Sequence, residues 1–356
     1  MDMKKSLLLL ALFMCAFCLL TVAMIIGPAG TIFLSHASVK SSSNVGPKIK
    51  HFIRTPLNRT LEPCKKCPNN LKFVNSLEEL RGNISTVFNL NNSLAVYKSH
   101  VVPEKMMFRQ SFMTTGQKPT GINGDSFEDN FYTIETQKSC ALVGSSGILN
   151  GSHCGREIDS HDFVMRINLP VVAGYEKEVG HKTNLTAINS SVFYFLRKYL
   201  EEKGEKIEKY RHYLDSLRYL ANCIIWMNHD ISKRPFRMSI KQLQTALIKT
   251  MVDANCSYRV AYSPVPTYPK LTNRFWNKTT ASEGFVMFTI APLFCKEITL
   301  YGFWPFPYDR HGTYVNHHYY HESFYKRRNI TMTGEFDILQ DLNKRGVIKL
   351  VTDKCA

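Results

Sequence analysis

Residues 140–170 read CALVGSSGILNGSHCGREIDSHDFVMRINLP, and this stretch decides the fold. It opens on an apolar run at 140–144, turns through two glycines at positions 144 and 147, and closes on a second apolar run at 162–168. Glycines at such a turn let backbone N–H groups approach a phosphate or a sugar, and a helix that starts there adds partial positive charge. The pattern predicts a strand, a ligand-binding turn and a helix, although a plain turn between strand and helix has the same form.

Apolar runs of similar length recur along the rest of the chain, with helical stretches between them. Further buried strands are predicted at 184–189, 223–227, 258–262 and 298–303. Helices are predicted near 76–80 and at 192–220, 239–252, 282–294 and 334–344. Such alternation predicts a mostly parallel sheet that is covered by helices on both faces, a Rossmann-like α/β/α sandwich.

The N-terminus carries an apolar run that follows two lysines. Lys4 and Lys5 precede an uncharged stretch from Leu7 to Ile26, and about twenty apolar residues are enough to cross the hydrocarbon core. A cleaved signal peptide would have a shorter apolar region and a small-x-small cleavage site. The lysines keep the N-terminus cytoplasmic, which gives type II topology. We expect a cytoplasmic tail at 1–6, a transmembrane signal-anchor at 7–27, a stem at 28–75 and a lumenal catalytic domain at 76–356.

Glycosylation triplets and cysteines both indicate that the body of the protein is lumenal. Asn-x-Ser/Thr triplets begin at Asn58, Asn83, Asn91, Asn150, Asn184, Asn189, Asn255, Asn277 and Asn329. Of these, the predicted glycosylation sites are Asn58, Asn83, Asn91 and Asn277. Outside the anchor lie eight cysteines, and an even number in a lumenal chain is typical of disulfides. Cys64 and Cys67 have no second cysteine or histidine pair to complete a zinc site, so no metal is expected.

The formal net charge of +16 favours anionic partners. Lumenal topology excludes nucleic acid, which leaves a sugar nucleotide or an acidic glycan, and charge alone does not choose between these and plain solubility.

The sequence from residue 140 to residue 185 is similar to a known motif. The order CxxVGxxGIL, CGxEID, DFVxRxNLP and VGxKTxL closely resembles the large donor-binding motif of animal sialyltransferases, in particular their α2,8-linking branch. The resemblance implies donor contacts from the glycine turn and from two asparagines. These residues are Gly144, Ser145, Ser146, Gly147, Asn168 and Asn189. Ser145 stands where the family usually has asparagine, and Asn189 lies in a glycosylation triplet, so a donor contact there requires that it carry no glycan.

Residues 281–306, ASEGFVMFTIAPLFCKEITLYGFWPF, resemble the small sialyltransferase motif. Ser282 and Gly284 precede an apolar helix, where a hydroxyl and backbone N–H groups suit a phosphate. Glu283 stands where the family commonly has threonine; a carboxylate beside an anionic donor is unexpected, so it points away or pairs with a lysine. The sequence YGFWPF is typical of the α2,8 branch. Trp304 offers a flat face to a sugar or base, with a plain core aromatic as the alternative.

The resemblance also implies disulfides. The family joins its two motifs by a bridge, which corresponds to Cys140–Cys295, and the α2,8 branch adds a second bridge, which corresponds to Cys154–Cys355. Cys223 and Cys256 remain as a third pair by elimination and spacing.

Transfer to an acceptor hydroxyl needs a base, and histidine suits that task. His317-His318-Tyr319-Tyr320 resembles the family's third motif, with His321 where an acidic residue usually follows. Glu335 matches the fourth motif, but the histidine that serves as the family's base is replaced by Ile330. The catalytic candidates are therefore His318, His321 and Glu335.

The missing base leaves three alternatives open. Either His321, His317 or His311 accepts the proton, or transfer is slow, or the chain has lost it. A zinc site made by the clustered histidines is disfavoured, because no cysteine lies nearby and aspartates are few. The chain also lacks an Asp-x-Asp motif, in agreement with the metal-independent chemistry of the resembled family.

The resemblance implies a Golgi type II membrane enzyme that moves sialic acid, with inversion, from CMP-sialic acid to a terminal sialic acid on a glycoprotein or glycolipid. No cofactor is expected beyond that donor, and a homodimer is left open. Scattered basic residues before the small motif favour short products over long polymers. The alternatives are a catalytically impaired Golgi protein that binds the donor, and a secreted binding protein.

Overall fold

The computed structural model describes a large part of the predicted catalytic domain. The described residues are 74–88, 90, 94–98, 131–202, 210–229, 237–263, 268–277, 281–321 and 330–356. The expected tail, the anchor at 7–27 and the stem as far as residue 73 lie outside them, so these boundaries remain predictions. Among the described residues, no helix is long and apolar enough to cross a membrane.

One sheet organises the described part of the chain, with the strand order β2-β1-β7-β6-β5-β4-β3-β8-β9. The strands are β1 (Ala95–Tyr97), β2 (Phe131–Tyr132), β3 (Gln137–Val143), β4 (Phe163–Ile167), β5 (Leu185–Ile188), β6 (Ile224–Met227), β7 (Arg259–Tyr262), β8 (Cys295–Tyr301) and β9 (Lys349–Val351). From β7 to β9 all neighbours pair in parallel, whereas β1 is antiparallel to both β7 and β2. The predicted mostly parallel sheet is confirmed.

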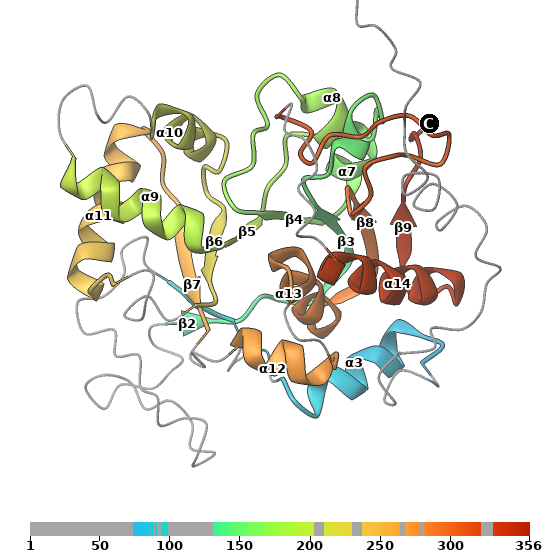
Figure 1. Ribbon diagram of the computed structural model, residues 1–356. Coiled ribbons are helices and arrows are strands. Elements are labelled where there is room, and N and C mark those ends of the chain that lie inside the picture. Colours follow the sequence, from blue (N-terminus) through green and yellow to red (C-terminus); the bar gives the residue numbers. More distant parts are fainter. Residues whose placement is uncertain are drawn as a thin grey trace, which may run out of the picture. The chain divides into compact units, whose positions relative to one another are not determined.

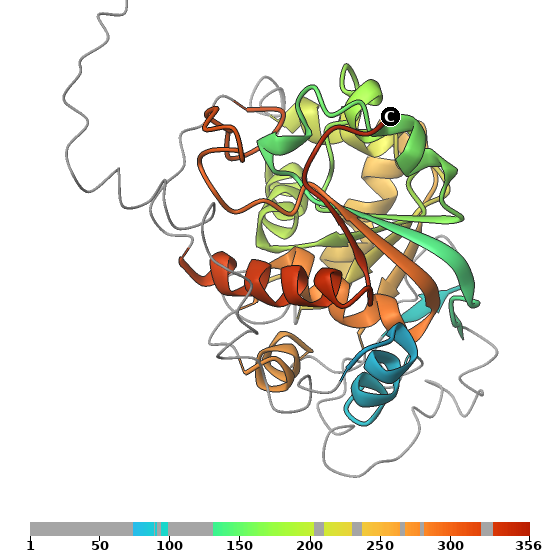
Figure 2. The same ribbon diagram turned by 90° about the vertical axis from the view of Figure 1, so that its right-hand side faces the viewer.

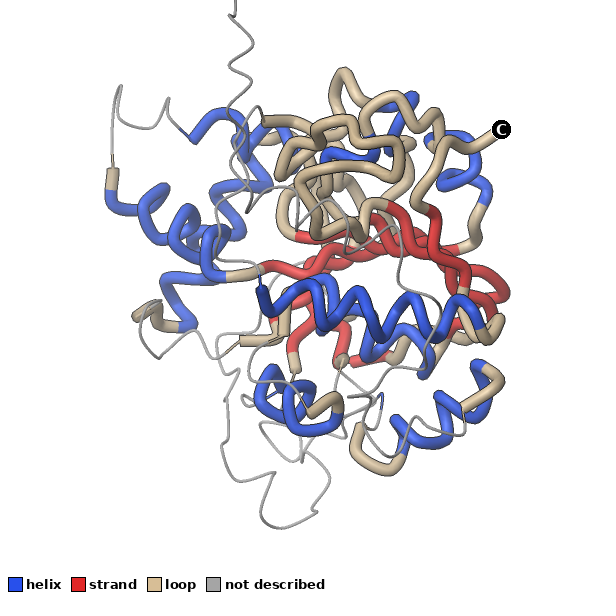
Figure 3. The backbone as a smooth tube through the Cα atoms, turned by 45° about the vertical axis from the view of Figure 1, so that its right-hand side comes forward, coloured by secondary structure: helices blue, strands red, loops and turns tan. Residues whose placement is uncertain are grey.

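Helices cover both faces of this sheet (Figures 1 and 2). They are α3 (Leu77–Ser85), α7 (Gly155–Ser160), α8 (Glu176–Val179), α9 (Ser190–Glu201), α10 (Arg211–Arg218), α11 (Ile240–Asp253), α12 (Tyr268–Phe275), α13 (Glu283–Ile290) and α14 (Ile330–Lys344). Side chains alternate between the faces along each strand, as in β3, where Leu142 joins the core under α13 and α14 and Val143 joins the core under α7. Helices α9, α10 and α11 pack on a third core over β6 and β7. Figure 3 shows helices lying on both sides of the strands.

Helix α13 lies at the centre of its layer and is apolar on every side. The residues from Gly284 to Ile290 are all buried. A helix that is apolar all round belongs in a core rather than at a surface. It therefore provides a fixed platform, and its first residues open toward the edge where β4 and β5 end.

Two elements differ from the prediction. The stretch at 192–220 is two helices, α9 and α10, separated by residues outside the description. The turn after β3 continues only as one 3₁₀ turn, Gly147–Leu149, rather than as a helix. Gly151 and His153, which both have positive φ, break the chain direction before α7 begins. The expected helix dipole at Gly147 is therefore absent, and α13 supplies the helix start at this edge.

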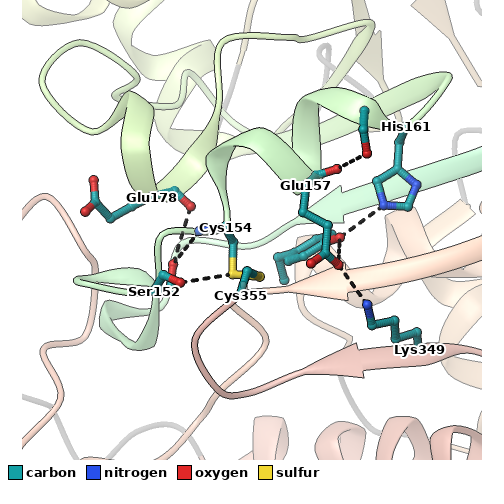
Figure 4. Close-up of a disulfide and its surroundings, with 9 residues drawn as sticks. Ser152, Cys154, Glu157, His161, Glu178, Lys349 and Cys355 are labelled. Atoms are coloured by element: carbon teal, nitrogen blue, oxygen red, sulfur yellow. Dashed lines mark hydrogen bonds and ion pairs between the residues drawn. A yellow bond between two sulfur atoms is a disulfide. The ribbon is translucent and has the colours of Figure 1, made fainter.

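Two disulfides join segments that are distant in the sequence. Cys140–Cys295 joins the neighbouring strands β3 and β8, and Cys154–Cys355 joins the loop before α7 to the C-terminal segment. Figure 4 shows the second bridge beside an ion pair of 2.8 Å between Lys349 Nζ and Glu157 Oε1. Both bridges are those that the resemblance implies.

The third bridge is not formed. Cys223, just before β6, and Cys256, just before β7, are free thiols in the structure. Burial raises the pKa of the Cys223 thiol well above its usual value. The predicted Cys223–Cys256 disulfide is therefore wrong. The two cysteines precede neighbouring strands, but no bond joins them.

The predicted glycosylation sites lie in different settings. Asn277 is exposed, with positive φ, just after α12, whereas Asn83 is half-buried on α3. Asn58 and Asn91 lie outside the described residues.

Candidate active site

A cleft opens where β3, β4, β5 and β8 end. The order of strands reverses at β3, because β4 lies on one side of it and β8 on the other. The carboxyl ends of parallel strands at such a reversal are the usual ligand site of open α/β sheets. The cleft is lined by Gly144, Ser145, Ser146, Ile167, Asn168, Asn189, Ser282, Glu283, Gly284, Gly302, Phe303, Trp304, Pro305, His317, His318, Glu335, Phe336 and Leu339.

Two glycines let the loops after β3 and β8 meet at the floor of the cleft. Gly144 N donates to Tyr301 O at 2.7 Å, and Ser146 N donates to Gly302 O at 3.2 Å. A Cβ atom on Gly144 would lie 2.4 Å from Gly302 O, which no side chain tolerates, and Gly302 itself has a φ of 70°. The first motif glycine is therefore needed for backbone packing between the two motifs.

Gly147 lies outside the cleft lining, against a different loop. A Cβ atom there would lie 2.5 Å from Asn316 O, and Gly147 N donates to that oxygen at 3.1 Å. Tyr319 N donates to Ser145 O at 3.0 Å, which holds the same loop beside the β3 turn. The turn thus positions the histidine loop, and Gly147 contributes through packing.

Asn168 and Asn189 connect the ends of β4 and β5. Asn168 has a φ of 59°, and its Oδ1 accepts a hydrogen bond of 3.0 Å from Asn189 N. Asn189 begins α9, where its Oδ1 accepts from Ser191 N at 2.9 Å. Both side-chain oxygens are used within the protein, so the Nδ2 groups remain as donors for an anionic or polar ligand.

Glu335 holds the start of α13 in place. Ser282 N donates to Glu335 Oε1 at 2.7 Å, and Ser282 Oγ donates to Glu335 Oε2 at 2.6 Å. Ser282 Oγ also accepts from Phe285 N at 3.2 Å as the cap of the helix. Both carboxylate oxygens are therefore engaged, and Glu335, 5% exposed, positions the helix start. This differs from the catalytic role that the sequence suggested for it.

We expect Glu335→Ala to destabilise the protein by about 2–3 kcal/mol, since it removes two charge-assisted hydrogen bonds and leaves the part-buried donors of Ser282 without a partner. It should raise KM for the donor more than it lowers kcat, because the helix start is displaced while the remaining cleft residues are unchanged. Denaturant unfolding and donor saturation curves measure the two effects. Lys344→Gln, an exposed change on the same helix, is the control, and a normal KM in Glu335→Ala would contradict the assignment.

Trp304 is a core residue with little surface left for a ligand. It is 6% exposed, its Nε1 donates to Tyr308 O at 2.9 Å, and its ring packs edge to face against Phe336 at 5.3 Å and Phe306 at 5.0 Å. The core alternative is therefore favoured over stacking on a sugar. Phe303, which is less buried and lines the cleft, was not singled out from the sequence.

The histidines divide into two groups. His317 and His318 line the cleft with ring centroids 4.2 Å apart, whereas His311 and His321 are exposed and do not line it. Burial, followed by the charges of His317 and His321, lowers the pKa of His318 to about 4, and burial also lowers the pKa of His317. Both cleft histidines are neutral near pH 7, which makes them hydrogen-bonding groups and weak bases.

The position at which the resembled motif has its base histidine lies at the start of α14. Ile330 is the first residue of that helix, five residues before Glu335. Within the described part of the chain, no three histidine, cysteine or acidic side chains gather in a way that could hold a metal ion.

Asn228 is a site neighbour that the sequence analysis did not select. It follows β6 directly, is 1% exposed and donates from Nδ2 to Glu283 Oε1 at 2.5 Å. A polar residue just after a buried strand was the available signal, because that position faces the ligand edge of a parallel sheet.

The family model for glycosyltransferase family 29 (sialyltransferase) matches residues 86–347. The chain belongs to this family. Its relatives include the alpha-N-acetylneuraminide alpha-2,8-sialyltransferase of Xenopus tropicalis and the alpha-2,8-sialyltransferases 8E of Rattus norvegicus and Mus musculus. Each is 31% identical over 225 residues, or 61% of this chain. The matched region spans 61%, 56% and 52% of their respective lengths.

Among solved structures, a mammalian sialyltransferase in complex with Gal-beta-1-3GalNAc-ortho-nitrophenol has 19% sequence identity and a TM-score of 0.44, covering 77% of this chain and 96% of that chain. The resemblance to sialyltransferases and to their α2,8 branch, drawn from the motifs, is confirmed by the family match and by the names of these relatives.

Proposed function

We propose that this chain is a Golgi α2,8-sialyltransferase with type II topology. It moves sialic acid from CMP-sialic acid to a terminal sialic acid on a glycoprotein or glycolipid, with inversion and without a metal or other cofactor. The observation that carries the proposal is the convergence of both sialyltransferase motifs on one cleft at the strand reversal.

The cleft supplies hydrogen-bond donors suited to a sugar nucleotide. The start of α13 presents backbone N–H groups and the favourable end of the helix dipole to a phosphate. The Nδ2 groups of Asn168 and Asn189 and the neutral imidazoles of His317 and His318 add side-chain donors. When the acceptor oxygen attacks the anomeric carbon, its proton passes to a neighbouring base or to solvent, the bond to the phosphate breaks and the phosphate leaves with the electron pair, so these donors stabilise the leaving group.

The α2,8 linkage is supported by the names of the relatives and by the YGFWPF sequence at 301–306. A second candidate follows from Ile330: a family member that binds CMP-sialic acid in the Golgi without transferring sialic acid.

A transfer assay with the full-length protein separates the candidates. The protein is incubated with CMP-sialic acid and a panel of acceptors that end in α2,3- or α2,6-linked sialic acid, and the new linkage is identified by linkage-specific sialidase digestion. Formation of an α2,8 product supports the proposal. Donor binding without transfer to any acceptor supports the second candidate, and failure to bind the donor rejects both. Immunofluorescence against a Golgi marker tests the location.

A further inference from the structure

The carboxyl group of Glu283 lies in the cleft and is only half satisfied. Its Oε1 accepts the hydrogen bond from Asn228 Nδ2, and its Oε2 has no partner among the described residues. Neither a lysine nor an arginine pairs with it there, and it lines the cleft, so neither alternative expected from the sequence, a lysine partner or a side chain that points away, describes it. Oε2 is therefore available to a ligand in the cleft.

No basic side chain among the described residues of the cleft offsets the charge of an ionised Glu283, so an anionic ligand beside it would be repelled. In the described part of the chain, no lysine or arginine lines the cleft, whose other titratable side chains are Glu335, His317 and His318. His229 follows Asn228, and burial lowers its pKa, so it is neutral near pH 7. Arg166 of β4 donates to carbonyl groups of Val179 and Lys182 on the opposite face of the sheet. The remaining charged groups on elements packed against α13 lie on β3, α12 and α14, and Lys138, Arg274 and Lys344 among them are exposed; the full set is Lys138, Lys270, Arg274, Asp337, Asp341 and Lys344.

Two effects compete for the proton on Glu283. Its place as the first residue of α13 favours the ionised form, because the helix dipole is positive at that end. Burial opposes this, and it raises the pKa of the Glu283 carboxyl to about 7, with the Asn228 hydrogen bond as a smaller opposing influence. An anionic ligand beside Oε2 would repel the carboxylate and favour the acid further.

We propose that Glu283 binds the anionic donor as a neutral carboxylic acid, with the Oε2–H group donating a hydrogen bond to a phosphate or carboxylate oxygen. Donor binding then takes up one proton whenever the free protein is ionised at this position. The inference rests on the proposed function, because it assumes that CMP-sialic acid occupies the cleft. The one covalent change is the O–H bond that forms when the carboxylate takes a proton from solvent; no bond of the donor is made or broken.

Donor affinity should fall as the pH rises above 7. Below pH 7 the Glu283 side chain is already the neutral acid, so its ionisation does not change the affinity for the donor. Above pH 7 the neutral fraction falls about tenfold for each pH unit, and the Kd for the donor rises in the same proportion. The cleft histidines protonate only below their ordinary range, so they do not produce a slope between pH 7 and 8.5.

The test measures binding of CMP-sialic acid, CMP and cytidine to the full-length protein in detergent by titration calorimetry from pH 6 to 8.5. Two buffers of different ionisation enthalpy report proton uptake. The variants are Glu283→Gln, a neutral mimic that retains an acceptor for Asn228, and Glu283→Thr, which has the residue common in the resembled motif. Glu297→Gln, an exposed change on β8, is the control.

We expect the wild type and Glu297→Gln to lose about tenfold in affinity for CMP and CMP-sialic acid between pH 7.5 and 8.5, with uptake of nearly one proton at pH 8.5. Glu283→Gln and Glu283→Thr should bind with a flat pH profile, and cytidine, which is uncharged, should show no slope with any variant.

Three outcomes would overturn the inference. The first is an unchanged pH dependence of Kd in Glu283→Gln. The second is an equal pH dependence for cytidine, which would mean that Glu283 contacts the cytosine ring rather than an anionic group of the donor. The third is a Glu283→Gln variant that binds the donor normally but has lost all transfer, which would make Glu283 the proton acceptor. If no variant binds CMP-sialic acid at any pH, the proposed function itself fails, and this inference fails with it.

Discussion

Ile330→His is expected to raise kcat for sialyl transfer by roughly 10²–10⁴-fold, the contribution typical of a positioned general base. Isoleucine cannot accept a proton from the acceptor hydroxyl. The two histidines that line the cleft are held neutral with lowered pKa values, so they are weak substitutes. The first residue of α14 lies on the order of 7–8 Å along the helix axis from Glu335, at the 1.5 Å rise of an α-helix.

The measurement is a single-turnover transfer rate with the donor saturating, because this isolates the chemical step from binding. Ile330→Gln is the matched control: it is polar and of similar length to histidine but has no titrating group, so it should stay at the wild-type rate. The bell-shaped pH profile of Ile330→His should gain a limb in the range where histidine titrates. A histidine variant no faster than the glutamine variant would show that another group already accepts the proton.

Removing the Cys140–Cys295 bridge by the double substitution Cys140→Ala/Cys295→Ala is expected to destabilise the protein by about 5 kcal/mol. The bridge closes a loop with a sequence separation of 155, and the entropy that it removes from the unfolded chain gives this value in the chain-entropy model. Because it joins the strands that precede the two cleft-forming loops, donor binding should weaken along with stability.

Denaturant unfolding with the other bridge left intact measures the effect. Cys256→Ser, which alters a half-exposed free thiol, should change the free energy of unfolding by less than about 1 kcal/mol. A loss below about 1 kcal/mol in the double variant would mean that the unfolded chain is already constrained, and that the loop argument does not apply.

The sheet could be predicted from the sequence because its central strands are buried on both faces. Runs such as CIIWM at 223–227 therefore appear as continuous apolar stretches. The three-residue strands β1 and β9 and the two-residue β2 have no such signal, since their pairing depends on neighbours supplied by the rest of the fold. The sequence predicts a helix after β3 where the structure has one 3₁₀ turn, because the positive φ at His153 cannot be recognised from a pattern of residue types.

The sequence predicted the cleft residues that lie within the two motifs. It did not predict the hydrogen bonds between them. Glu335 and Ser282 are 53 residues apart in sequence, and Asn228 and Glu283 are 55 apart, so only the folded sheet brings each pair together. The roles of Gly147 and Trp304 likewise depend on what packs against them. The spacing of residues along the chain does not show which oxygen of a carboxylate already accepts a hydrogen bond.

The all-round burial of α13 has a consequence for biosynthesis. Residues 284–290 carry no charge, and their cover comes partly from α14, which begins 40 residues after α13 ends. During synthesis this segment leaves the ribosome before its cover exists, and uncharged apolar segments that are transiently exposed are prone to aggregate. Slow or truncated production of the C-terminal part should therefore lower the yield of folded protein before it affects any property of the finished molecule.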